Sequence, residues 1–306
     1  MKKYSEVLEK YHLKPNKIEY KGKAIILYTD EGNFVLKENG RENKNEIYEY
    51  LKSRHFTYYP DTISERGTDY EIVPYIESSK IPDDQKMLDL IDLLALLHSK
   101  TTHYKEVTED DYKEIYEDVK GNIEHLKTYY NDQIALIETK IFMSPSEYLL
   151  ACNISKILAA LYYAENEIEN WYKIVKEKRT MRHVVLHNNL SLDHFIRNEE
   201  SYFINWKKAK IGIPIFDFYK LYKRHGLQFD FYDLLTYYEK KYPLQEEERK
   251  LLFILMSLPD KLEERETEYA RCKMVSEKID FLYKTEYIIS PYNTKKSKED
   301  NTHKEK

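Results

Sequence analysis

Alternating apolar and polar positions predict strands in the first part of the chain. Residues 18–28 alternate, and Asp30-Glu-Gly-Asn33 separates them from the apolar run Phe34-Val-Leu-Lys37. A period of two is typical of half-buried strands, and clusters of Asp, Gly and Asn are typical of turns. We therefore expect a hairpin or meander over residues 18–37, and a further strand over residues 70–76.

A helical spacing of apolar residues lies between these strands, over residues 41–54, and ends before Thr57-Tyr-Tyr-Pro60. The pattern as a whole predicts a small antiparallel sheet with one helix, which forms an N-terminal lobe over residues 1–77.

After Pro82 the apolar positions recur with a period near 3.6, which is typical of packed helices. The predicted helices cover residues 87–98, 112–131, 144–177 and 229–242. Short strands are expected at residues 183–186, 195–197 and 202–204. We predict a mainly helical C-terminal lobe over residues 78–291, so the fold class is α+β with two lobes. Residues 292–306 are charged and have little to bury, and they are predicted to be a disordered tail.

The composition narrows the possible partners. The 306 residues suffice for two lobes, each with its own core. A net charge of -5 offers no general attraction for nucleic acid or for an anionic membrane.

No run of 18 apolar residues exists and the chain begins with a charged segment, so we expect an intracellular protein. The two cysteines, Cys152 and Cys272, are expected to stay reduced. Oligomeric state is left open.

One segment has the spacing of a phosphotransferase active site. In kinase-like enzymes a catalytic loop reads His-x-Asp-x-x-x-x-Asn, and an Asp that binds Mg²⁺ follows about fifteen residues later. The matching positions in this chain are His187, Asn189, His194 and Asn205. Both key aspartates are therefore replaced by asparagine.

These motifs resemble the aminoglycoside phosphotransferase and choline kinase branch of the protein-kinase-like fold. Residues 183–224 carry most of the likeness, and the runs Leu93-Leu-Ala-Leu-Leu-His-Ser99 and Phe34-Val-Leu-Lys37 are also similar to family segments. Within this branch the chain most resembles the spore-coat kinase-like proteins of the CotS/YutH type. The resemblance implies a bilobal kinase-like fold and contacts with spore-coat or other proteins. It also implies a place in the mother-cell cytoplasm or in the spore coat.

The resemblance also assigns roles to individual residues. Lys37 matches the lysine that binds the nucleotide phosphates, and Glu46 or Glu42 would orient it; the spacing does not choose between them. Asp217 matches an acidic residue that braces the catalytic loop. The first strands offer only Gly22 and Gly32, without the Gly-x-Gly-x-x-Gly run that covers phosphates in many nucleotide sites.

The substitutions remove chemistry that phosphoryl transfer needs. An amide at Asn189 cannot accept the proton of a substrate hydroxyl, and general-base catalysis contributes on the order of 10²–10⁴ in rate. Asn205 offers a neutral oxygen where Mg²⁺ prefers carboxylates. The imidazole of His194 suits zinc or copper better than Mg²⁺, and His187 and His194 lack further ligands for a metal site. We therefore expect a pseudokinase that acts as a binding module, without a cofactor.

Several alternatives stay open at this stage. His187, Asn189 and His194 can be hydrogen-bonding residues that only maintain the loop, and Asp217 can be a helix-start residue. Asp193 can supply a carboxylate from a shifted loop. The competing function is an active phosphotransferase that uses ATP and Mg²⁺ on a small-molecule or protein hydroxyl.

Overall fold

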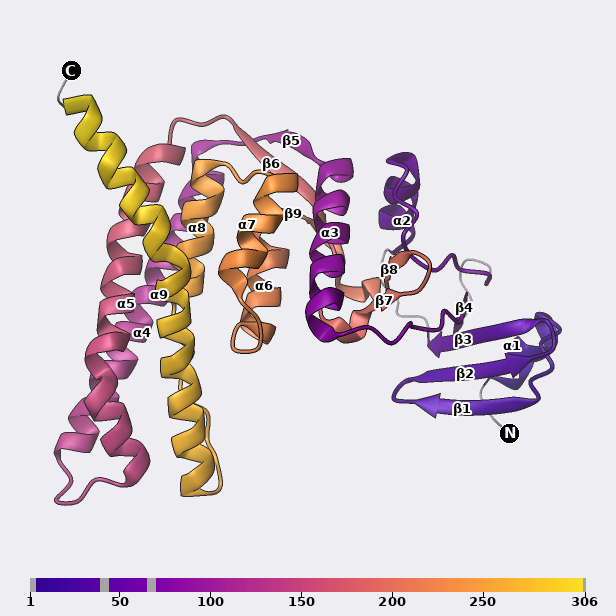
Figure 1. The fold of residues 1–306 in the computed structure, drawn as a ribbon, viewed down its shortest axis with the longest axis horizontal. Coiled ribbons are helices and arrows are strands. Elements are labelled where there is room, and N and C mark those ends of the chain that lie inside the picture. Colours follow the sequence, from indigo (N-terminus) through magenta and orange to yellow (C-terminus); the bar gives the residue numbers. More distant parts are fainter. Residues whose placement is uncertain (1–3, 39–43, 65–69, 305–306) are drawn as a thin grey trace. The chain divides into compact units, whose positions relative to one another are not determined.

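The structure is a computed structural model that describes residues 4–38, 44–64 and 70–304. It forms two compact units, each built from separate stretches of chain (Figure 1). The first unit comprises Met1–Thr101 and Val185–Ile211, and the second comprises Thr102–Val184 and Gly212–Lys306. The chain therefore passes between the units three times.

An antiparallel four-stranded sheet in the order β1-β2-β3-β4 forms one part of the first unit. Its strands are β1 (Lys17–Lys21), β2 (Ala24–Thr29), β3 (Gly32–Glu38) and β4 (Tyr70–Pro74). Gly22 has a φ of 61° in the two-residue turn between β1 and β2, a conformation that glycine adopts without steric cost. One face of the sheet packs around Leu27, Leu36 and Ile72 and is covered by residues of α1 (Ser5–Lys10).

The rest of the first unit surrounds the helix α3 (Asp83–Thr101). Apolar residues occupy most sides of this helix, which is typical of a helix buried in a core. It contacts a small hairpin and the one-turn 3₁₀ helix that precedes it. The remaining elements of the unit are α2 (Lys44–Ser53), η1 (Leu192–His194), β7 (Phe195–Arg197), β8 (Ser201–Phe203) and η2 (Trp206–Lys208).

Two long helices, α4 (Glu109–Glu138) and α5 (Pro145–Val175), form a hairpin in the second unit (Figure 1). Both begin with a capping box, in which the side chain at the helix start and an acid three residues later satisfy backbone N–H groups. Thr108 and Asp111 cap α4, while Ser144 and Glu147 cap α5.

The α5 helix is the central element of the second unit, because α4, α8 and α9 all pack against it. Its Trp171 is buried and donates a hydrogen bond of 3.0 Å from Nε1 to the carbonyl oxygen of Glu247. The other helices are α6 (Ile215–His225), α7 (Phe231–Lys241), α8 (Glu246–Ser257) and α9 (Glu268–Lys304). β5 (His103–Glu106) pairs with the start of β6 (Thr180–Leu186), and β9 (Lys210–Gly212) is a further short strand.

The compact units and the C-terminal helix follow other bounds than the predicted lobes and tail. The first unit includes α3 and the loop segment, whereas the pattern suggested a boundary near residue 77. Tertiary packing of α3 against β7 and β8 causes this difference, and periodicity does not report such contacts. At the C-terminus, α9 continues to Lys304 through the segment predicted to be disordered. Extension of a helix costs little once its first turns are formed and anchored.

Among the described residues, no helix combines the length and the apolar character needed to cross a bilayer.

The buried ion pair between Arg182 and Glu248 gives a test of the stability of the second unit. Arg182 donates from Nε to Oε1 of Glu248 at 2.8 Å, and both side chains are almost fully buried. We predict that Arg182→Ala lowers the free energy of unfolding by about 3–5 kcal/mol, because it leaves a buried carboxylate without its cation. Urea denaturation measures this loss.

The matched control replaces both partners, as Arg182→Met with Glu248→Leu. This double variant is expected to lose less than Arg182→Ala, although Glu248 also caps α8 through the backbone N–H of Gln245. A stability of Arg182→Ala within about 1 kcal/mol of the unchanged protein would contradict the assigned role.

Candidate functional site

The candidate site lies in the loop that follows β6, within the first unit. His187 begins this loop and is fully buried. Its Nε2 lies 2.9 Å from the carbonyl oxygen of Ile204, and its ring packs against those of Phe203 and Trp206. A carbonyl only accepts, so Nε2 must donate in this contact. His187 therefore ties the start of the loop to the segment after β8, which is a bracing role.

His194 connects the two asparagines that replace the expected aspartates. Its Nδ1 lies 2.6 Å from the main-chain oxygen of Asn189, and its Nε2 lies 3.0 Å from the side-chain Nδ2 of Asn205. The carbonyl of Asn189 requires a proton on Nδ1, so in a neutral ring Nε2 accepts from the amide of Asn205. Asn189, His194 and Asn205, three of the positions predicted from the motif, are thus brought together in one hydrogen-bond network.

The backbone of Asn205 is in the left-handed region, with φ at 65°. Asparagine tolerates this conformation better than most residues, so the turn can be kept without strain from a bulkier side chain. Asn188 has a φ of 60° and donates from Nδ2 to the carbonyl of Lys208 at 2.8 Å. Lys207 donates from Nζ to the carbonyl of Glu38 at 3.2 Å, which links this segment to the end of β3.

An aromatic cluster surrounds the buried Trp206, which follows Asn205 directly in the chain. The rings of Tyr48, Phe56 and Tyr59 all lie within 6.4 Å of the Trp206 ring, centroid to centroid. Burial and the nearby Asp61 raise the pKa of Tyr59 to about 12. Burial and the carboxylate of Glu71 likewise raise the pKa of Tyr48. Both hydroxyls therefore stay neutral at physiological pH, and the cluster acts through packing.

Lys37 lies on β3, as the sequence predicted for a phosphate-binding lysine. The strand register places Glu71 of β4 directly opposite it, on the same face of the sheet. Glu71 is nearly buried and accepts a hydrogen bond of 3.1 Å from Oγ1 of Thr62. Glu46 is exposed in the first turn of α2, and Glu42 lies outside the described residues. The ion-pair role of either glutamate stays a prediction.

Asp217 lies in the second unit, in the first turn of α6, and is fully buried. A carboxylate at that position interacts favourably with the helix dipole. Its predicted contact with the loop would join the two units and stays a prediction.

The exposure of Asp193 and the side chains around it bear on the alternatives left open for the loop. Asp193 is exposed in η1, whereas His194 beside it is partly buried in the network. Among the described residues, no group of three or more His, Cys, Asp or Glu side chains could hold a metal ion. The connection from β1 to β2 is only Gly22 and Lys23, so it differs from the glycine-rich loop of many phosphate sites.

Sequence reasoning missed two contributors to the site. Glu71 is far from Lys37 in sequence, and only the pairing of β3 with β4 brings the two together. Lys207 lies within residues 183–224, which carry the family likeness, but its hydrogen bond to the carbonyl of Glu38 depends on tertiary structure. The alternation within residues 70–76 could have suggested the pairing of the strands but not its register.

Comparisons with known proteins identify the fold. No family model matches the chain, and no curated protein matches it. Among solved structures, an aminoglycoside phosphotransferase from Alicyclobacillus acidocaldarius superposes with a TM-score of 0.66 at 10% identity, covering 92% of this chain and 91% of that chain. A spectinomycin phosphotransferase in complex with ADP and spectinomycin superposes with a TM-score of 0.51 at 13% identity, covering 92% and 97%.

The chain therefore has the protein-kinase-like fold that is found in aminoglycoside phosphotransferases. The sequence prediction of an α+β kinase-like fold, with a small antiparallel sheet and a larger helical part, is confirmed. At these identities the likeness shows the fold alone.

The hydrogen bonds of His194 give a spectroscopic prediction. We expect its neutral ring to carry the proton on Nδ1, because the carbonyl of Asn189 can only accept. Long-range ¹H–¹⁵N correlation spectra, recorded where the ring is neutral, distinguish the two nitrogens. In the control variant Asn205→Ala, Nδ1 should stay protonated while the Nε2 signal shifts. A ring protonated on Nε2 in the unchanged protein would contradict the network.

Proposed function

We propose that this protein is a catalytically degenerate kinase-fold protein that acts as a binding or scaffold module. The observation that carries the proposal is the hydrogen bond between Asn205 and His194. It joins the two positions at which the family motif would provide Mg²⁺ ligands, and neither of the two side chains is a carboxylate. The likeness to phosphotransferase structures supports the architecture that the proposal assumes.

The loss of charge accounts for the loss of chemistry. Phosphoryl transfer depends on neutralising phosphate charge with metal ions and on a base that positions the hydroxyl. Asn189 supplies no base, which removes a factor on the order of 10²–10⁴ in rate. Asn205 and His194 supply no anionic oxygen, while Mg²⁺ is usually held through carboxylates and phosphates. The side chains of Asn205 and His194 already form a hydrogen bond with each other, and this bond has to break before either side chain can contact a metal ion.

The finer part of the proposal is a role in assembling the spore coat. It rests on the resemblance of residues 183–224 to spore-coat kinase-like proteins, and it would place the protein in the mother cell or in the coat. Its partners would then be coat proteins, bound through surfaces outside the degenerate loop.

A second function, that of an active phosphotransferase, is favoured by Lys37. This lysine is kept on β3 in a half-buried position with Glu71 opposite, an arrangement suited to holding phosphates. ATP and Mg²⁺ would be its cofactors, and a small-molecule or protein hydroxyl would be its substrate.

Titration calorimetry and radiolabelled transfer assays separate the two functions. We expect neither heat of binding from ATP with Mg²⁺ or Mn²⁺ nor transfer to protein or aminoglycoside acceptors. Metal-dependent turnover that is abolished by Lys37→Ala would overturn the proposed loss of catalysis and establish the second function.

Restoration of the motif is a sharper test than its further loss. We predict that Asn189→Asp, His194→Asn and Asn205→Asp together raise the affinity for Mg²⁺–ATP by about 10–100-fold, a range typical of groups that tune a metal site. The histidine has to be changed as well, because its ring would otherwise hold the new carboxylate at position 205. Calorimetry measures the gain.

The matched control is the same triple variant with Lys37→Ala, in which the gain should disappear. The double variant that keeps His194 should gain less than the triple variant. An unchanged affinity in a correctly folded triple variant would show that the amides do not set the affinity for the metal nucleotide.

A further inference from the structure

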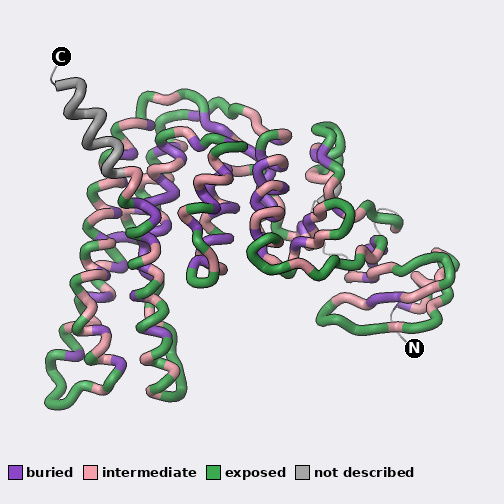
Figure 2. The backbone as a smooth tube through the Cα atoms, viewed as in Figure 1, coloured by how far each residue is buried: buried purple, intermediate pink, exposed green. Residues whose placement is uncertain are grey.

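Two histidines face each other across the paired strands β5 and β6 in the second unit. The strand register places His103 directly opposite His183, so both side chains leave the same face of the sheet. Their ring centroids are 6.0 Å apart, and the ring planes are inclined by 31°. Both side chains are half-buried, the class drawn pink in Figure 2, so solvent and small ions can reach them.

The opposite face of the same strands is occupied by a different set of contacts. Arg182, the neighbour of His183 in β6, forms the buried ion pair with Glu248, and its guanidinium carbon lies 4.4 Å from the centre of the Tyr242 ring. Because successive side chains of a strand leave opposite faces, His183 points away from this ion pair. The histidine pair therefore lies outside the buried charge network of the unit.

One nitrogen of His183 is oriented by the main chain. Its Nδ1 lies 3.2 Å from the carbonyl oxygen of Met181, and because a carbonyl only accepts, Nδ1 carries the proton in this contact. In the neutral ring Nε2 then keeps its lone pair. Histidines that bind metal ions have this arrangement, since their second ring N–H usually donates to a carboxylate or to a backbone carbonyl.

The surroundings of His183 favour its neutral form. Burial lowers the pKa of His183, and the charges of His103 and Lys105 lower it further, whereas the hydrogen bond to Met181 and the carboxylate of Asp111 act in the opposite direction. A metal ion binds the neutral imidazole, so a lowered pKa reduces the competition from protons at neutral pH.

We propose that His103 and His183 together bind one divalent transition-metal ion of the zinc, copper and nickel class, with water in the remaining coordination positions. Imidazole nitrogen suits these ions better than it suits Mg²⁺ or Ca²⁺. Metal–nitrogen bonds of about 2.0–2.1 Å place the two ligating nitrogens of one ion about 3–4 Å apart. Two rings with centroids 6.0 Å apart reach this separation by rotation about their side-chain bonds.

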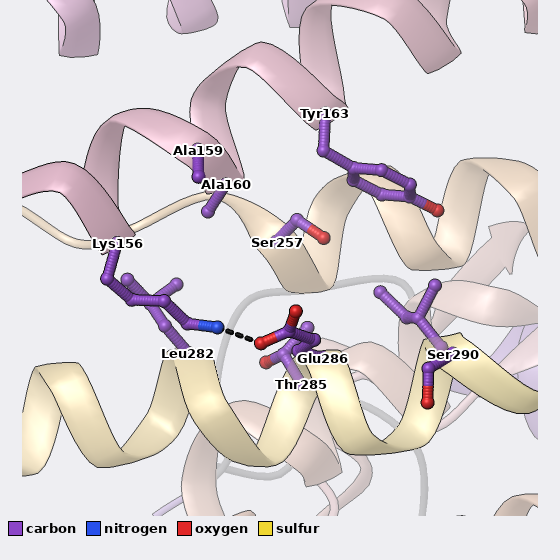
Figure 3. A pocket seen from close by; sticks show the side chains of 10 residues that line it. Lys156, Ala159, Ala160, Tyr163, Ser257, Leu282, Thr285, Glu286 and Ser290 are labelled. Carbon is purple, nitrogen blue, oxygen red and sulfur yellow. Dashed lines mark hydrogen bonds and ion pairs between the residues drawn. The ribbon is translucent and has the colours of Figure 1, made fainter.

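The pocket in the same unit does not offer this chemistry. It lies between α5, the end of α8 and α9, has a volume of about 250 Å³, and is shown in Figure 3. None of the described residues that line it is a histidine or a cysteine, and two of them, Lys156 and Glu286, form an ion pair with each other.

The proposed site has only two protein ligands. Among the described residues, no group of three or more His, Cys, Asp or Glu side chains could hold a metal ion, so neither histidine belongs to a larger set of such ligands. Binding is therefore expected to be weaker than at a structural zinc site with four protein ligands, and the ion exchanges with its concentration in solution.

The position of the pair along the chain gives the bound ion a structural effect. His103 is the second residue after the passage at Thr101–Thr102, and His183 comes one residue before the last residue of the second unit at the passage Val184–Val185. The ion links β5 to β6, and β6 continues into the loop that begins with His187. Metal binding thus stabilises the strand that leads to the candidate site. The inference does not depend on whether that loop binds nucleotide.

Titration calorimetry of the full chain with Zn²⁺ at neutral pH, after removal of metal with EDTA, tests the proposal. His103→Phe and His183→Phe each keep an aromatic ring but remove a ligand, and each should weaken binding of Zn²⁺ by more than about tenfold, since loss of an outer-shell partner alone costs about 10–100-fold. Glutamine at either position serves if a phenylalanine variant does not fold. The control His125→Phe changes an exposed histidine of α4 in the same unit and should bind Zn²⁺ as the unchanged protein does.

Two further measurements separate metal binding from simple packing of the rings. Pulsed electron paramagnetic resonance of bound Cu²⁺ should detect two coordinated imidazoles in the unchanged protein and one in either variant of the pair. Zn²⁺ should raise the melting temperature of the unchanged protein and of His125→Phe, but not of the pair variants, because only a bound ligand stabilises the folded chain. The affinity should fall as the pH drops below about 6.5, where protons compete for the imidazoles.

The proposal would be overturned by an unchanged protein that binds no Zn²⁺. It would equally be overturned if His103→Phe and His183→Phe bound Zn²⁺ as tightly as His125→Phe, because the ion would then be held elsewhere in the chain.

Discussion

The imidazole of His194 is the interaction on which the geometry of the loop depends. It accepts from the amide of Asn205 and donates to the main chain of Asn189, so it joins two segments that the motif needs side by side. Neutral hydrogen bonds of this kind contribute about 1 kcal/mol each and need no counter-ion. Two anionic groups in the same places would repel one another unless a cation stood between them. The present residues thus hold the loop together in the absence of a metal.

The surrounding packing also holds this segment in place. The ring of Trp206 is buried among aromatic residues from α2 and the following segment, and His187 ties β6 to Ile204. None of these contacts uses a carboxylate of the catalytic motif. The segment after β8 is therefore held by aromatic packing and by hydrogen bonds to the main chain, without a carboxylate.

Much of the fold could be predicted from the sequence, because its elements are regular. The alternation over residues 18–37 matches β1 to β3, and the long apolar periodicity of residues 144–177 matches α5. The site could be predicted only in part. The spacing of Asn189, His194 and Asn205 located the loop, but the hydrogen bonds through His194 and the pairing of Lys37 with Glu71 depend on contacts distant in sequence. The extent of α9 was missed because its charged end carries no apolar period.

The three passages of the chain between the units have a consequence for its synthesis. Residues 102–184 emerge from the ribosome before residues 185–211 complete the first unit, and α8 and α9 emerge later still. Neither unit can therefore finish folding as an early, independent domain, in contrast to chains whose domains follow one another. The faces of α5 that pack against α8 and α9 stay exposed until those two helices have been made, and a polypeptide that stops before residue 185 lacks the whole loop that follows β6.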